Sequence, residues 1–147
     1  MIDNTLQQLI YFSQRGEQVS DTEVLDGIVL PAMRKNRALD ITGCLWFNAD
    51  AFVQIFEGDP ARVDELFDVI RGDPRHHDVV LLDVRSTLTR TFERFSMRIV
   101  DAHALPHFVA LNDLLGAPRR HRRAPVPPDD PGVRELLDLF RCPVQPA

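Results

Sequence analysis

Three polar side chains in apolar surroundings have the chemistry to hold a planar ligand. Tyr11 and Gln54 each lie within an apolar run, and Asn36 ends a predicted helix just before the sequence DITG. A buried polar side chain costs roughly 1–3 kcal/mol unless it is hydrogen-bonded, so Gln54 between Val53 and Ile55 needs a partner. A carboxamide offers one acceptor and two donors, which match a ring edge that alternates carbonyl and N–H groups. The alternative for each residue alone is a bond within the protein.

Four segments of the sequence predict the β-strands that must carry these residues. They are residues 6–13, the hairpin 41–58 with a polar turn at 48–50, residues 79–84, and residues 92–100. Each is an apolar or alternating run bounded by turn-forming residues. In the last segment, the period of two places Phe95 and Met97 on the same face.

Two helices are predicted between these strands. A capping box at Ser20–Glu23 begins the first, and we expect a kink or break near Leu30 because Pro31 removes an amide donor. Asp59 and Pro60 supply an N-cap and a first helical residue for the second, which ends near residue 72.

The order of elements predicts an α+β fold, the ferredoxin-like β-α-β-β-α-β-β arrangement followed by C-terminal helices. Both helices then lie on one face of the sheet, and Tyr11 and Gln54 share that face on neighbouring central strands. The amphipathic segments 106–115 and 133–140, joined by a proline-rich linker at 119–132, suit a cover for the other face or a subunit contact. We therefore divide the chain into a ligand-binding domain, residues 1–102, and a helical extension, residues 103–147.

Composition excludes several classes of protein. The chain has 147 residues, the size of one domain, and a net charge of -5, which argues against a nucleic-acid binder. Cys44 and Cys142 form no redox or metal motif, and His103 and His107 lack partners for a zinc site, so we expect no metal and a cytoplasmic, reducing environment. Neither a basic leader nor a run of about 20 apolar residues is present, so we expect neither export nor a membrane span.

Five segments together resemble the BLUF family of flavin-binding blue-light photoreceptors. They are LIYFSQ with Tyr11, RKNRALDITGCL with Asn36, AFVQIFEG with Gln54, DPRHH with His76, and FERFSM with Met97, in the family's order and spacing between about residues 6 and 100. The resemblance implies a photoreceptor rather than an enzyme, with FAD bound non-covalently between the two helices. The sequence does not exclude FMN or riboflavin.

The resemblance also implies a role for each matching residue. Tyr11 is similar to the tyrosine that passes an electron and a proton toward the excited flavin. Gln54 is similar to the glutamine whose rearranged side chain makes a new hydrogen bond to the flavin C4 carbonyl and shifts its absorption to the red. Asn36 resembles the asparagine that holds the polar edge of the ring, Ile28 a residue that packs on the ring, and His76 a histidine near it.

The chain departs from the family pattern at three positions. Phe95 stands where many members carry tryptophan, so no indole N–H is available there to pair with Gln54; Phe95 and Met97 remain the expected relay. Lys35 replaces an asparagine or histidine and places a cation near the ring or in solvent. Pro31 alters the helix that walls the pocket.

The expected output is a signal to an unidentified partner protein through the C-terminal helices. We also expect a homo-oligomer, because an uncovered sheet face and an amphipathic tail would offer apolar surface. Two alternatives remain on the same scaffold. One is a small acylphosphatase-like phosphatase, in which Arg15 holds phosphate and Asn36 orients water; the other is a flavin-free interaction module.

Overall fold

One mixed five-stranded sheet forms the centre of the computed structural model, which describes residues 5–93, 96–116 and 126–141. Its strands are β1 (Leu6–Arg15), β2 (Thr42–Phe47), β3 (Ala51–Gly58), β4 (His76–Thr87) and β5 (Arg98–Asp101). They lie in the order β4-β1-β3-β2-β5, and all neighbours are antiparallel except β2 and β5. The predicted α+β, ferredoxin-like fold is confirmed, with β1 and β3 paired in the middle.

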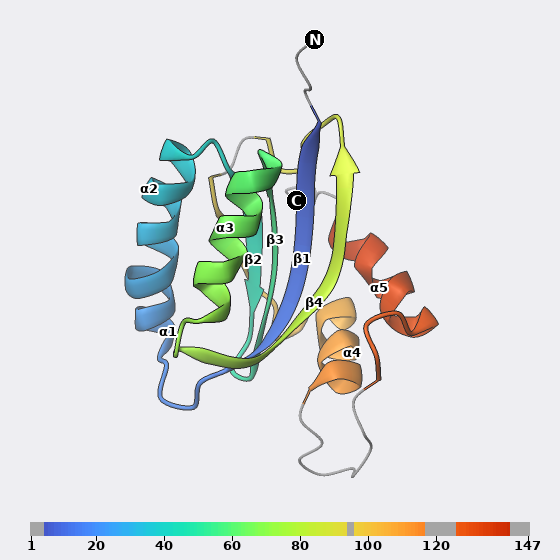
Figure 1. Cartoon of the computed structure of the whole chain (residues 1–147). Coiled ribbons are helices and arrows are strands. Elements are labelled where there is room, and N and C mark those ends of the chain that lie inside the picture. The colour runs from blue at the N-terminus through green and yellow to red at the C-terminus, as the bar shows by residue number, and fades with distance from the viewer. Residues whose placement is uncertain (1–4, 94–95, 117–125, 142–147) are drawn as a thin grey trace.

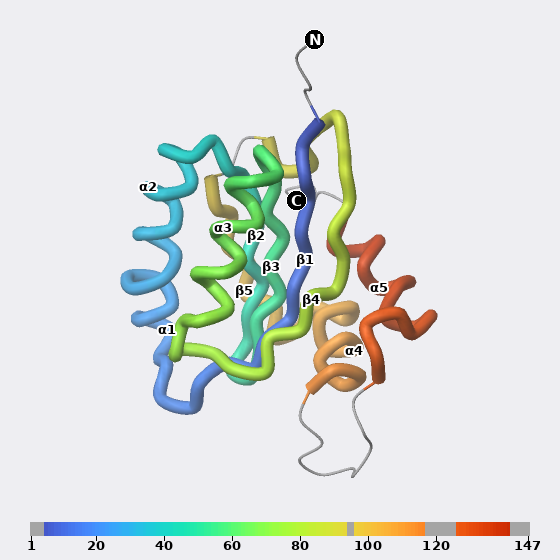
Figure 2. Tube along the Cα trace, viewed as in Figure 1, coloured from blue at the N-terminus to red at the C-terminus, as the bar shows by residue number. Residues whose placement is uncertain are grey.

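Two helical segments cover one face of this sheet (Figure 1). The first consists of α1 (Asp21–Glu23), the π-helix η1 (Val24–Val29) and α2 (Leu30–Ala38), and Figure 2 shows it as one continuous trace. The second is α3 (Pro60–Arg71). Both predicted caps are present: the Glu23 N–H donates to Ser20 Oγ at 3.1 Å, and the Arg62 N–H donates to Asp59 Oδ2 at 3.3 Å.

The irregularity expected in the first helical segment takes the form of the π-helix, which ends just before Leu30. Pro31 has no N–H to donate to the Gly27 carbonyl four residues earlier. Arg75, which lies outside this segment, donates from Nη1 to that carbonyl at 2.6 Å. A side chain from a distant loop therefore supplies a hydrogen bond that the proline does not make.

The opposite face of the sheet is covered by α4 (Pro106–Leu115) and α5 (Pro131–Arg141) (Figure 1). Phe108, Leu137 and Phe140 are fully buried there against Trp46 and its neighbours, and the Trp46 and Phe140 rings meet edge to face with centroids 5.0 Å apart. The sequence left open whether these helices cover the sheet or form a subunit contact. In the structure they cover the sheet. The expected homo-oligomer stays a prediction, although the uncovered sheet face that partly motivates it is covered by α4 and α5.

Helix α5 is also held to the sheet by ionic side chains. Asp83 of β4 pairs with Arg141 and, at 3.2 Å, with Arg134; we call these three residues the α5 clamp. Arg141 also donates to Gln8 Oε1 at 2.9 Å. Burial raises the pKa of Asp83, but hydrogen bonds and charges from Arg134 and Arg141 outweigh burial and hold that pKa below its usual value. Burial, followed by repulsion from Arg85, lowers the pKa of Arg141, yet a guanidinium stays charged at any ordinary pH.

The prediction of a strand over residues 92–100 is wrong at the described residues 92, 93, 96 and 97, because β5 begins only at Arg98. Two backbone groups of the described residues before β5 bond to side chains. The Phe92 N–H donates to the buried carboxylate of Glu57 at 2.5 Å, and the Ser96 carbonyl accepts from Asn36 Nδ2 at 2.9 Å. Phe95 lies outside the described residues, so its expected place beside Met97 stays a prediction.

The division of the chain at residue 102 also stays a prediction. Helices α4 and α5 share a single apolar cluster with the sheet, and residues 117–125 of the proline-rich linker lie outside the described part. None of the helices in the described ranges has the length and apolar character that crossing a bilayer requires.

Candidate functional site

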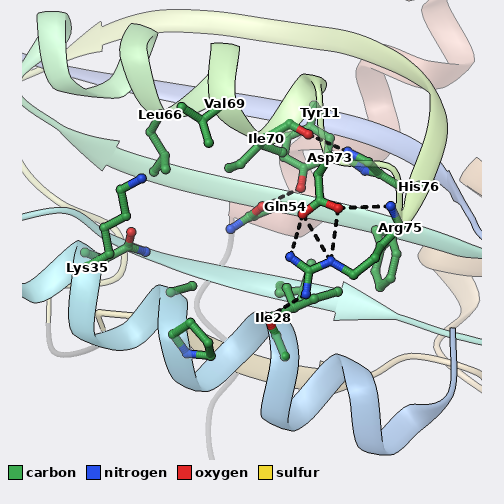
Figure 3. A pocket seen from close by; sticks show the side chains of 16 residues that line it. Tyr11, Ile28, Lys35, Gln54, Leu66, Val69, Ile70, Asp73, Arg75 and His76 are labelled. Carbon is green, nitrogen blue, oxygen red and sulfur yellow. Dashed lines mark hydrogen bonds and ion pairs between the residues drawn. The ribbon is translucent and has the colours of Figure 1, made fainter.

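A cavity lies between the first helical segment, α3 and the sheet (Figure 3). Its empty volume is about 830 Å³, which includes the part open to solvent. Most of its wall is apolar. All five residues predicted to contact a cofactor line it: Tyr11, Ile28, Asn36, Gln54 and His76. The structure thus brings together side chains from β1, η1, α2, β3 and β4 around one space.

A hydrogen-bonded chain crosses the sheet side of the cavity. Tyr11 and Gln54 are direct partners in the β1–β3 register, and the Tyr11 O–H donates to Gln54 Oε1 at 2.5 Å. The other end of the carboxamide, Nε2, donates to Met97 Sδ at 3.6 Å. Gln54 therefore connects a phenol on β1 to the residue that immediately precedes β5.

The Tyr11 phenol is kept in its protonated form. Burial raises its pKa well above the usual value, and the negative charge of Asp73 raises it further. Phe67 and His76 pack against the ring, with centroids 5.7 Å and 6.0 Å away. Tyr11 is therefore an O–H donor with a fixed orientation.

Asn36 presents an unpaired acceptor at the cavity. It lies in the last turn of α2 with 1% of its surface exposed, and its Nδ2 donates a hydrogen bond to the Ser96 carbonyl. Its Oδ1 is one of two buried side-chain polar atoms in the described chain without a partner; the other, Trp46 Nε1, lies on the opposite face. Such an orphaned acceptor is costly unless a donor reaches it. A ring N–H of a flavin is a donor of the required kind, so the residues present fit that group.

His76 walls the cavity and supports Tyr11. Its Nε2 lies 2.6 Å from the Ile70 carbonyl, which can only accept, so Nε2 carries a proton. Its Nδ1 lies 2.7 Å from Ser13 Oγ, and in the neutral ring it accepts from that hydroxyl. Both ring nitrogens are thus used within the protein, and the ring face is what His76 offers to a ligand.

One end of the cavity is closed by two residues that the sequence reasoning missed. Arg75 pairs with Asp73 at 2.6 Å and bridges to the Gly27 carbonyl, so it ties the loop before β4 to the first helical segment. The hydrogen bond from Arg75, with smaller contributions from nearby charges, holds the pKa of Asp73 below its usual value despite partial burial. Asp73 and Arg75 flank Pro74 beside the predicted histidine, but their spacing alone resembles an ordinary turn.

The pair of residues proposed for a phosphatase is not brought together. Arg15 does not line the cavity that Asn36 lines. Its guanidinium donates to the carbonyls of Val19 and Asn48 and pairs with Asp21. These bonds leave the guanidinium committed within the chain. In the described ranges, no three His, Cys, Asp or Glu side chains are grouped as metal ligands.

Comparisons with known proteins agree with the family resemblance seen in the sequence. The family model described as "BLUF: Sensors of blue-light using FAD" matches residues 6–98. The photoactivated adenylate cyclase subunit beta of Euglena longa is 34% identical over 114 residues, which are 77% of this chain and 13% of that protein. This chain therefore corresponds to a small part of that relative.

Two solved structures extend the comparison. The photo-activated state of BlsA superposes with a TM-score of 0.71 and 25% identity, covering 97% of this chain and 99% of that one. Klebsiella pneumoniae BlrP1 with FMN and cyclic diGMP is 40% identical with a TM-score of 0.62, covering 67% of this chain and 26% of that one. The first match includes the C-terminal helices as well as the sheet.

Proposed function

Because the chain belongs to the BLUF family, the sensors of blue light using FAD, we propose that it binds FAD non-covalently in the cavity and that Tyr11 and Gln54 carry its light response. The observation that carries this proposal is the convergence of three polar groups on one apolar cavity. These are the Tyr11 O–H bonded to Gln54 Oε1, the Gln54 carboxamide itself, and the unpaired Asn36 Oδ1.

The roles proposed for the lining residues follow from the atoms they have free. Asn36 Oδ1 accepts from an N–H on the polar edge of the ring, which satisfies the orphaned oxygen. Ile28 packs on the ring from the helical wall, and His76 offers its ring face from the other end. FMN carries the same ring, and BlrP1 has been solved with FMN; we propose FAD because the family description names it.

When bound, a flavin would supply absorption of blue light and an acceptor to which Tyr11 would give up an electron and a proton. The Tyr11 proton is held ready on the short bond to Gln54 Oε1. Loss of that donor removes the interaction that fixes the orientation of the Gln54 carboxamide. Exchange of its oxygen and nitrogen ends then takes Nε2 away from Met97 Sδ.

The signal is proposed to leave the site through Met97. Met97 packs with Leu45 and Phe52 beside the cavity and directly precedes β5, which pairs in parallel with β2. Rearrangement of Gln54 changes the relative stability of two packings of this segment, which is the requirement for any light-driven switch. A downstream protein, contacted through β5 and helices α4 and α5, is the proposed recipient, with Phe95 as a further relay residue.

Purified protein distinguishes this proposal from the two alternatives. A yellow protein with a reversible red shift of its absorption in blue light supports the sensor. Release of phosphate from a phosphate ester supports the phosphatase. Colourless protein with neither behaviour supports the flavin-free interaction module, and either of the last two results contradicts the proposed function.

A further inference from the structure

The side chains that line the cavity carry more positive than negative charge. Lys35, Asp73 and Arg75 are the lining residues that carry a full charge at neutral pH. Asp73 and Arg75 neutralise each other at 2.6 Å. The ammonium group of Lys35 makes no hydrogen bond or ion pair with any residue in the described ranges; only its backbone carbonyl is used, by the Leu39 N–H. One uncompensated positive charge therefore borders a largely apolar cavity, which favours a ligand that carries a negative charge.

Lys35 lies where the charged part of such a ligand must be. A phosphate loses strong hydration on burial, so it stays at the solvent side of a site while an apolar ring enters. Lys35 is exposed although it lines the cavity. Figure 3 shows its side chain extending from α2 toward Leu66 of α3, at the end of the cavity away from Asp73 and Arg75.

We propose that Lys35 binds the phosphate of the cofactor's ribityl tail and gives the site its preference for phosphorylated flavins over riboflavin. This inference rests on the proposed flavin binding and adds the direction in which the tail leaves. The isoalloxazine ring is neutral, so the phosphate is the anionic group that pairs with Lys35. At the opposite end, Asp73 occupies the guanidinium of Arg75, so that pair offers a phosphate no uncompensated positive charge. The unusual lysine beside Asn36 thus has a role that the ring-binding residues do not explain.

The size of the effect follows from the exposure of Lys35. An exposed ion pair is worth up to about 1 kcal/mol, which is roughly a fivefold change in affinity. Screening by salt reduces it further. We therefore expect the full chain to bind FMN and FAD about three to five times more tightly than riboflavin at low salt, with the difference shrinking as salt is added.

The test compares dissociation constants of the flavin-free full chain for riboflavin, FMN and FAD, measured by quenching of flavin fluorescence. In Lys35→Gln we expect the FMN-to-riboflavin preference to fall close to one, with riboflavin affinity unchanged. Lys35→Arg keeps the preference. Arg34→Gln is the matched control, since it removes one exposed positive charge from the same helix at a position that does not line the cavity.

Two results overturn the inference while leaving flavin binding intact. One is an unchanged FMN-to-riboflavin preference in Lys35→Gln. The other is an equal loss of affinity for riboflavin, FMN and FAD in Lys35→Gln, which would mean that Lys35 contacts the flavin ring and not the phosphate. Failure of the unaltered chain to bind riboflavin, FMN or FAD is a separate outcome that overturns the proposed function together with this inference.

Discussion

The two faces of the sheet use the same strands in opposite ways. On β3, Gln54 faces the cavity under the first helical segment and α3, while Val53 and Ile55 face a filled core under α4 and α5. The first face keeps an open space with an unpaired acceptor in its wall. The second has a contiguous apolar cluster, with ionic groups at its margin in the α5 clamp. One face thus keeps room for a ligand, and the other forms a packed internal contact.

The difference shows what buried polar groups indicate in this protein. Asp83 and Arg141 on the filled face satisfy each other, so they stabilise a contact and need no ligand. Asn36 Oδ1 on the open face is satisfied by nothing in the described chain. An unpaired buried acceptor beside a cavity therefore indicates a site more specifically than polarity alone does.

The largest effect should come from removing an aromatic ring from the filled face. We expect Phe140→Ala to lower the free energy of unfolding by about 3–5 kcal/mol, because it leaves a cavity against Trp46. Flavin affinity per folded molecule should not change. Urea denaturation and flavin titration measure the two quantities.

The matched control for this variant is Leu139→Ala, at a neighbouring position that is 50% exposed. We expect less than about 1 kcal/mol there. A loss of flavin affinity in Phe140→Ala that parallels the loss of stability would mean that the two faces are not independent.

The α5 clamp should contribute less, and in a pH-dependent way. Because the pKa of Asp83 is lowered on folding, its contribution is present above the unfolded value near 3.8 and is lost as the pH falls through the lower, folded value. We expect Asp83→Asn to cost about 1–2 kcal/mol at pH 7. The difference from the unaltered chain should disappear in acid, as measured by urea denaturation across this pH range.

Asp68→Asn provides the comparison on the other face. Asp68 pairs with Arg71 on the surface of α3, and both side chains are more than half exposed. We expect a change below about 0.5 kcal/mol at pH 7. Equal effects of the two substitutions would show that the clamp adds nothing beyond a surface ion pair.

Of the substitutions at Phe140, Asp83 and Asn36, the one at Asn36, the orphaned acceptor on the open face, should change stability least. We expect Asn36→Ala to weaken riboflavin binding about tenfold, which is the effect of one hydrogen bond of about 1.4 kcal/mol. Without flavin, stability should change by less than about 1 kcal/mol, because the lost bond to the Ser96 carbonyl is offset by removal of the unpaired oxygen. Flavin titration and urea denaturation separate the two effects, and unchanged affinity would rule out Asn36 as a ring contact.

Local patterns were sufficient to predict most of the fold. Residues close together in the sequence predict the helix caps at Ser20 and Asp59 and the hairpin around Asn48. They also predict the amphipathic faces of α4 and α5. Amphipathicity predicts that a helix buries one face, but not whether its partner is the same chain or another. The cover of the sheet by α4 and α5 therefore needed the structure.

Long-range contacts account for what the sequence did not predict. Alternation suggested a strand from residue 92, but Glu57 and Asn36 take the backbone bonds of Phe92 and Ser96, and no local signal marks this. The bond from Arg75 to the Gly27 carbonyl is a similar case, because it joins a loop to a proline-containing helix 48 positions away. Tyr11, Asn36 and Gln54 stand out in the sequence by their chemistry, and Ile28 and His76 only by resemblance to the family. Their neighbours Asp73 and Arg75 were found only from the structure.

The most direct test of the light response compares Tyr11 with an aromatic residue on the other face. The measurement is the blue-light-minus-dark absorption difference of Tyr11→Phe, with Trp46→Phe as the control on the filled face. We expect Tyr11→Phe to keep its bound flavin and to show no red-shifted state, and Trp46→Phe to respond like the unaltered chain. A normal, reversible red shift in Tyr11→Phe would contradict the assignment of Tyr11 as the donor.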